Sequence, residues 1–181
     1  MGQYYRAYLR DVGGNEKTYA FMPSKLMETS WFDNVQVNKV AFEIFNWPCR
    51  VAWIGDYSDC AGCPEEIYKR TWEMPADYCL GYLENYPLDY DFNLRDMYLI
   101  NHSKKLFVNC NDYASRCNRN GWIIHPLPLL TCIGNGQGGG DYYSDNGTEY
   151  IGTWAFDWVS FDFEKPDLKI YSEIKPTFAE D

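Results

Sequence analysis

The chain has 181 residues, a length typical of one domain with a sizeable core. Hydrophobic residues make up 46% of it, which excludes a disordered chain, and its 16 Tyr, 10 Phe and 7 Trp favour strands and half-buried surfaces. The net charge of −10 disfavours direct binding to nucleic acid or to a membrane surface. The pair Lys104–Lys105 is too small to form a basic patch. The acidity serves solubility, or it forms a face that docks a basic partner such as a nucleic-acid-binding protein.

The sequence also predicts a compartment. The opening segment, Met1-Gly-Gln-Tyr-Tyr-Arg6, lacks the apolar core of a secretion signal. The longest apolar runs are far too short for a membrane-spanning helix. Seven cysteines is an odd number, which favours free thiols in a reducing compartment. We therefore expect a cytoplasmic protein.

Two element types are predicted in the first third of the chain. Strands at 3–9 and 18–21 flank the turn-forming Asp11-Val-Gly-Gly-Asn15, which indicates a β-hairpin. Residues 34–45 have the apolar spacing of a helix, with Asp33 as N-cap and Gln36 completing a capping box, and Trp47-Pro48 ends it. One face of that helix carries its apolar residues: Val37, Val40, Ala41 and Ile44.

The remaining elements follow in chain order. A buried strand is predicted at 50–54, and a helix from Pro64 to Trp72. Residues 74–96 are interpreted as a loop. Further expectations are a second hairpin (97–100 with 106–110), an extended segment at His125-Pro-Leu-Pro, a long strand region over 149–163 and an irregular tail from residue 164. The predicted fold is a single α+β domain over 1–181, mainly antiparallel and strand-rich, with two or so short helices.

The most distinctive segment is rich in glycine. Five glycines lie between residues 134 and 140, immediately before Asp141. Glycine lets backbone N–H groups turn toward a ligand and lets the ligand approach closely. The segment lacks the Gly-Lys-Ser/Thr ending of a P-loop, and no predicted helix follows it to hold a dinucleotide. It is either a ligand-binding loop or a connector. The candidate ligand-binding glycines are Gly134, Gly136, Gly138, Gly139 and Gly140.

A general-base pair is one possible chemistry near this loop. His125, with Asp141 or Asp157, could form such a pair, because a carboxylate can fix the orientation of an imidazole. The alternative is that His125 is a packed, hydrogen-bonded residue before a proline turn. The sequence pattern identifies no nucleophile to act with His125.

Two further patterns carry weaker chemistry. Cys60 and Cys63, spaced Cys-x-x-Cys between a predicted strand and a predicted helix, could be a redox dithiol or half of a zinc site. No matching second pair of ligands is visible. Several paired carboxylates could bind a cation, but none has the spacing of a known metal motif, so no metal site is predicted and the cofactor is unknown.

Several segments resemble a scattered microbial family of small proteins of unknown function. They are Met1-Gly-Gln-Tyr-Tyr-Arg6, Ile54-Gly-Asp-Tyr-Ser-Asp59, His125-Pro-Leu-Pro-Leu-Leu-Thr131 and Gly134-Asn-Gly-Gln-Gly-Gly-Gly-Asp141. The resemblance implies no activity or cofactor. It implies that the positions of Asp56, with Tyr57 beside it, and of Asp141 recur in the family while the Cys60/Cys63 pair does not, which favours Asp56, His125 and Asp141 as site residues.

Two functions from different classes follow. The first is an acidic protein-binding or inhibitor module of microbial or phage origin, which acts on a host protein through an acidic, aromatic surface. The second is a small enzyme or nucleotide-binding protein with its site around the glycine-rich segment and His125. The sequence names no partner, ligand or reaction.

Overall fold

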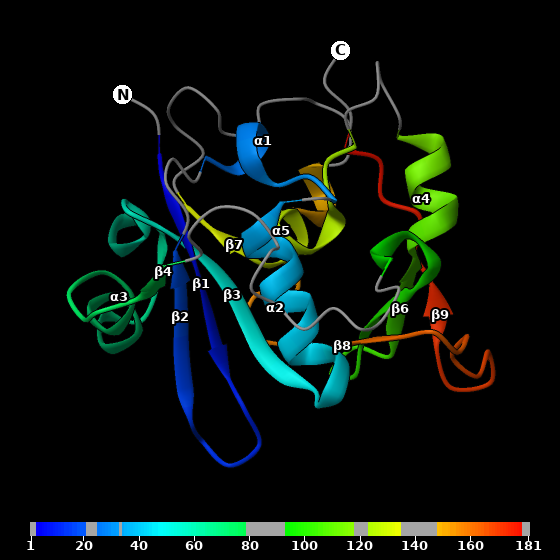
Figure 1. The fold of residues 1–181 in the computed structure, drawn as a ribbon, viewed down its shortest axis with the longest axis horizontal. Helices are drawn as coiled ribbons and strands as arrows, with labels where there is room; N and C mark the ends of the chain where they lie inside the picture. Colours follow the sequence, from blue (N-terminus) through cyan, green and yellow to red (C-terminus); the bar gives the residue numbers. More distant parts are fainter. Residues whose placement is uncertain are drawn as a thin grey trace.

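The computed structural model describes residues 3–20, 25–32, 34–78, 93–117, 123–134 and 148–178. These residues form an α+β fold in which helices pack on one mainly antiparallel, mixed sheet (Figure 1). The strands are β1 (Tyr5–Arg10), β2 (Glu16–Ala20), β3 (Cys49–Gly55), β4 (Asp77–Tyr78), β5 (Tyr98–Asn101), β6 (Leu106–Asn109), β7 (Cys132–Ile133), β8 (Trp158–Asp162) and β9 (Ser172–Glu173). The α-helices are α1 (Leu26–Thr29), α2 (Val35–Asn46), α3 (Glu65–Trp72), α4 (Cys110–Arg116) and α5 (Pro126–Thr131).

The sheet runs in the order β4-β2-β1-β3-β8-β5-β6-β9, with β7 paired to β3. Its two faces are buried by different helices, because successive side chains of a strand point to opposite sides. Leu9 and Val51 belong to the main core with α2, whereas Tyr8 and Ala52 belong to a smaller core with α3. In Figure 1, α2 crosses in front of the sheet. The turn of the β1–β2 hairpin lies at the bottom of the view, below α2.

Helix α2 confirms the predicted apolar face, since its four apolar-face residues are at most 1% exposed. The cap differs from the prediction. Asn34 is the N-cap, and its side chain accepts hydrogen bonds from the backbone N–H groups of Gln36 and Val37 at 2.9 and 3.2 Å. The Gln36 side chain donates to the Tyr19 carbonyl at 2.9 Å, which ties the helix to β2. Asp33, the predicted cap, lies outside the described residues.

Both predicted hairpins are confirmed, as are strand β3 and helix α3. The second hairpin ends earlier than expected, because Cys110 begins α4, a helix that the sequence did not predict. The Asn109 side chain caps α4 by accepting from the N–H groups of Asn111 and Asp112. Of the predicted loop 74–96, residues 79–92 lie outside the described part, and Asp77–Tyr78 form β4 beside β2.

The prediction of an extended segment at His125-Pro-Leu-Pro was wrong. Pro126–Thr131 is helix α5, with His125 as its N-cap in extended conformation. Prolines are compatible with a first helical turn, since the N–H groups they lack have no partner inside the helix there. The preference for extended backbone before a proline therefore holds at His125 (φ −72°, ψ 135°) and ends there.

The prediction of a long strand over 149–163 was also wrong, because β8 begins only at Trp158. The preceding residues form turns, with positive φ at Gly152 (69°) and Phe156 (63°), which extended backbone cannot accommodate. Their N–H groups bond to other elements: Gly152 to Leu129 O at 2.9 Å, and Trp154 to Leu130 O at 2.7 Å. These turns therefore satisfy the last carbonyls of α5.

The tail is mostly irregular, as predicted, except that β9 pairs in parallel with β6. Among the residues that the structure describes, no helix is both long enough and apolar enough to span a membrane.

Candidate functional site

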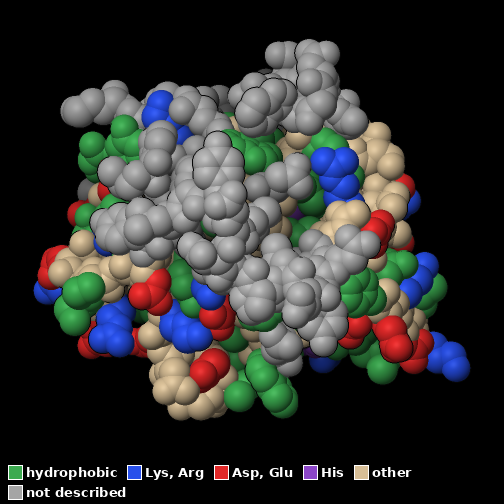
Figure 2. All heavy atoms as spheres, viewed as in Figure 1, with side chains coloured by type: hydrophobic (Ala, Val, Ile, Leu, Met, Phe, Trp, Pro, Cys, Tyr) green, Lys and Arg blue, Asp and Glu red, His purple; other side chains and the backbone are tan. Residues whose placement is uncertain are grey.

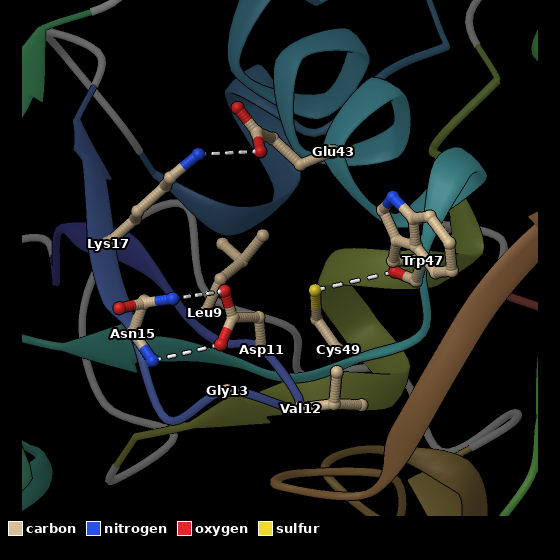
Figure 3. Close-up of a pocket in the computed structure, with 9 residues that line it drawn as sticks. All are labelled: Leu9, Asp11, Val12, Gly13, Asn15, Lys17, Glu43, Trp47 and Cys49. Carbon is tan, nitrogen blue, oxygen red and sulfur yellow. Dashed lines mark hydrogen bonds and ion pairs between the residues drawn. The ribbon is translucent and has the colours of Figure 1, made fainter.

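The site is a cavity of about 510 Å³ between the β1–β2 hairpin and the C-terminal end of α2 (Figure 3). We call it the hairpin recess. Figure 3 shows Cys49 between Trp47 on one side and the hairpin residues on the other. The recess is lined by Leu9, Asp11, Val12, Gly13, Asn15, Lys17, Glu43, Trp47 and Cys49.

Two side chains at the recess are the most exposed large hydrophobic residues of the described structure. Val12 is 75% exposed and Trp47 is 69% exposed. Trp47 follows the last residue of α2, where extended backbone (φ −149°, ψ 131°) takes it out of the helix. By contrast, Trp53 and Trp154 are each only 1% exposed. A tryptophan left in solvent beside a cavity is a surface that a partner can bury.

The two carboxylates of the recess differ in their partners. Glu43 accepts from Lys17 Nζ and from Tyr19 Oη, each at 2.8 Å, and against the effect of burial these hydrogen bonds lower its pKa. Asp11 is held by Asn15, whose backbone N–H and Nδ2 donate at 2.9 and 2.8 Å, and these bonds lower the pKa of Asp11. No cation of the described residues pairs with Asp11.

Burial and the charged residues around the recess shift the pKa of the Cys49 thiol, which lies at its floor. It is 6% exposed and donates to the Trp47 carbonyl at 3.4 Å. Burial, followed by the charges of Asp11 and Glu43, raises its pKa to about 11, while Lys17 acts in the opposite direction. The thiol is therefore protonated at neutral pH, and the net effect of the nearby charges is that of a negative environment.

The first residue of the glycine-rich segment, Gly134, lies where β7 runs beside β3. A Cβ atom at Gly134 would overlap the Tyr5 hydroxyl and stand 2.7 Å from Gln3 Oε1. The Tyr5 hydroxyl donates to the same Gln3 oxygen at 3.0 Å. Glycine is thus required here by internal packing. Gly136, Gly138, Gly139, Gly140 and Asp141 lie outside the described residues, so their ligand-binding role stays a prediction.

Asp56 and Tyr57 follow the end of β3, close to this glycine. The Asp56 carboxylate accepts from the Tyr4 N–H at 3.1 Å, and burial raises its pKa. The Gln3 side chain is fully buried and its Nε2 has no hydrogen-bond partner. The Asp56 carboxylate therefore does not accept a hydrogen bond from the Gln3 amide. Tyr57 is 39% exposed.

His125 lies in the core. Its Nδ1 accepts from the Leu127 N–H at 3.0 Å, its Nε2 has no partner, and its ring lies 4.5 Å from Phe32 and 5.6 Å from Phe161 between centroids. Burial lowers its pKa from 6.5 to about 3. The imidazole is therefore neutral at physiological pH and has no access to solvent, which is the packed, hydrogen-bonded alternative considered above.

Asp157 lies by the β5–β6 hairpin and is not paired with His125. It accepts from Asn101 Nδ2 at 2.8 Å and forms a short ion pair with Lys104. The other histidine, His102, joins the same hairpin to β8 through Ser160 Oγ at 2.8 Å and to the tail through Tyr171 Oη at 3.0 Å. The described residues thus do not assemble the proposed general-base pair, and a catalytic role for His125 and Asp157 stays a prediction.

The cysteine and carboxylate patterns do not form a centre in the described structure. Burial raises the pKa of Cys63, the opposite of what a redox-active thiol requires. Among the residues described, no group of three or more His, Cys, Asp or Glu side chains could hold a metal ion.

Comparison with known proteins assigns the chain to no family. No protein-family model, curated protein or solved structure matches it. The resemblance to a microbial family thus stays an expectation from the sequence.

Sequence reasoning missed the residues that define the recess. It interpreted Trp47 as the end of a helix and Asp11–Asn15 as a turn, and both interpretations are correct locally. The available signal was an aromatic residue directly after a helix and beside Pro48, but a sequence does not distinguish an exposed tryptophan from a buried one.

Proposed function

We propose that the protein is an acidic, non-enzymatic binding module, acting in the cytoplasm of a microbe or on behalf of a phage, that docks on a basic host protein through the hairpin recess. The observation that carries this proposal is the exposure of Val12 (75%) and Trp47 (69%) at the rim of a cavity. Exposed aromatic residues beside a pocket are the usual anchors of protein interfaces.

Charge supports the same function. The chain carries a net charge of −10, which attracts a positively charged surface and speeds its encounter. On the face drawn in Figure 2, acidic and basic side chains lie interspersed, with hydrophobic side chains among them. Contact specificity therefore has to come from local features such as the recess, while net charge contributes long-range attraction.

The experiment is affinity capture from host extract with matched variants. Val12→Lys places a positive charge at the rim, where it repels a basic partner, and Ile170→Lys makes the same change at another exposed position (57%), away from the recess-lining residues. A partner should be retained by the wild type and by Ile170→Lys, lost by Val12→Lys, and released progressively by salt. Retention of the same proteins by all three forms would refute the proposal.

The alternative, an enzyme or nucleotide-binding protein with a site around the glycine-rich segment, has less support from the described residues. His125 is buried and neutral, and Asp157 is engaged with Lys104. The binding module is therefore the function that the geometry favours.

A further inference from the structure

We propose that the hairpin recess receives an arginine side chain of the partner protein, with its guanidinium group at Asp11 and its aliphatic stem against Val12 and Trp47. This inference rests on the proposed function and names the chemistry of the partner. It follows from the polar groups of the recess that remain available, from its apolar rim and from its charge.

The first step concerns the carboxylates. Glu43 is already paired, with Lys17 at 2.8 Å and Lys39 at 3.6 Å. Asp11 has no cation among the described residues, and its carboxylate is held by two hydrogen bonds from Asn15 and by the backbone N–H groups of Gly13 and Gly14. Because these partners are neutral, the negative charge of Asp11 is not cancelled and still attracts a cation. Holding the carboxylate in one orientation lowers the entropy lost when that cation binds.

The second step concerns the apolar rim. An arginine side chain carries an aliphatic stem and a planar guanidinium group that stacks on aromatic rings. Val12 and Trp47 offer hydrophobic surface for the stem, and the indole face attracts a cation. An acidic side chain would instead meet the carboxylates of Asp11 and Glu43, which line the same recess and repel a negative charge.

The third step separates this local chemistry from net charge. Any basic peptide is attracted to a protein with a net charge of −10, so binding alone proves little. Glu164 provides a matched control, because it is exposed, does not line the recess and makes no side-chain bond among the described residues. Asp11→Asn and Glu164→Gln remove the same charge, and only the first removes it from the recess.

The test is calorimetric titration of an oligo-arginine peptide, with oligo-glutamine as the neutral control peptide, into the full-length protein and its variants. We expect Asp11→Asn to weaken binding by about threefold and Trp47→Ala by about tenfold, while Glu164→Gln stays within about twofold of the wild type. The thermal unfolding temperature of each variant checks the fold. We expect a small decrease for Asp11→Asn, because asparagine keeps an oxygen for the Asn15 N–H but loses the one that accepts from Asn15 Nδ2, and little change for the exposed Trp47.

A second readout locates the peptide directly. Trp47 lines the recess and is 69% exposed, so an occupied recess should slow oxidation of Trp47 by a tryptophan-specific reagent, measured by mass spectrometry of the peptide that contains it. Equal weakening by Asp11→Asn and Glu164→Gln, or unchanged oxidation of Trp47, would overturn the inference. If a host partner is lost with Val12→Lys but is unaffected by Asp11→Asn and by the competing oligo-arginine peptide, the proposed function stands and the arginine assignment fails.

Discussion

The buried imidazole of His125 makes the stability of this protein depend on pH in a defined window. Burial sets its folded-state pKa at about 3, against 6.5 when it is not buried. The unfolded chain therefore binds a proton that the folded protein excludes as the pH falls below 6.5. The folded pKa is the lower one, so the stabilising contribution is complete above pH 6.5 and is lost progressively toward pH 3.

The magnitude follows from this difference. Each pH unit within the window costs about 1.4 kcal/mol. Between pH 7 and pH 5 the free energy of unfolding should fall by about 2 kcal/mol. That is a large share of the stability of an ordinary domain, which is about 5–15 kcal/mol.

The assay is urea denaturation of the wild type and of His125→Asn at pH 7, 6 and 5. Asparagine can still accept the Leu127 N–H through its side-chain oxygen, so the cap of α5 is kept while the titrating group is removed. The variant starts from a lower stability because the smaller side chain packs less well, and the comparison is therefore between the two slopes.

Other titrating groups contribute less in this window. Asp11, Glu43 and Asp112 have lowered carboxyl pKa values, so their contribution is lost mainly at lower pH. His102 also has a lowered pKa and adds a slope of the same sign, but it is present in both proteins and cancels in the comparison. If wild type and His125→Asn lose stability in parallel between pH 7 and pH 5, His125 is not the buried neutral group described here.

Three further predictions concern packing, capping and thiols. Gly134→Ala should destabilise the protein by about 1–3 kcal/mol, because the new methyl group overlaps the hydroxyl of the buried Tyr5. In the control, Gly13→Ala, the nearest atoms stand at 3.2 and 3.3 Å on side chains of the hairpin turn, and equal thermal shifts in both variants would contradict this packing. Asn34→Ala should lower the free energy of unfolding by about 1 kcal/mol through loss of the α2 cap. Urea denaturation measures this against Asn38→Ala on the same helix, and an unchanged midpoint for Asn34→Ala would exclude the capping role. Cys110 is 0% exposed, and burial raises its pKa to about 12. In the native protein it should therefore resist a thiol reagent until urea unfolds the chain, and rapid labelling of the native protein, detected by mass spectrometry, would contradict this burial.

The sequence by itself determined the local elements whose signals lie within a few residues. The 3.6-residue spacing of Val37, Val40, Ala41 and Ile44 predicted the buried face of α2, because that pattern alone gathers apolar groups on one side of a helix. Likewise, the turn residues between alternating strands predicted both hairpins, and proline with two glutamates predicted the start of α3.

Tertiary structure decided the elements whose hydrogen bonds lead elsewhere in the chain. Residues 149–157 have the aromatic alternation of a strand, yet Gly152 and Trp154 donate to the carbonyls of Leu129 and Leu130 and form turns. Helix α5 was hidden by its two prolines, although a first turn accommodates them. The partners of Gly152 and Trp154 are distant in sequence, so no local pattern reveals them, whereas the prolines of α5 fit both an extended segment and a first helical turn, so the local pattern alone does not decide between them.

The candidate site shows the same division. The sequence identified His125 and the start of the glycine-rich segment as unusual, but it could not show that the imidazole lies between two phenylalanine rings or that Gly134 makes room for Tyr5 and Gln3. It also could not distinguish Trp47 from Trp53, since burial depends on which elements cover a residue after folding. The hairpin recess exists only because the β1–β2 turn and the end of α2 meet in space.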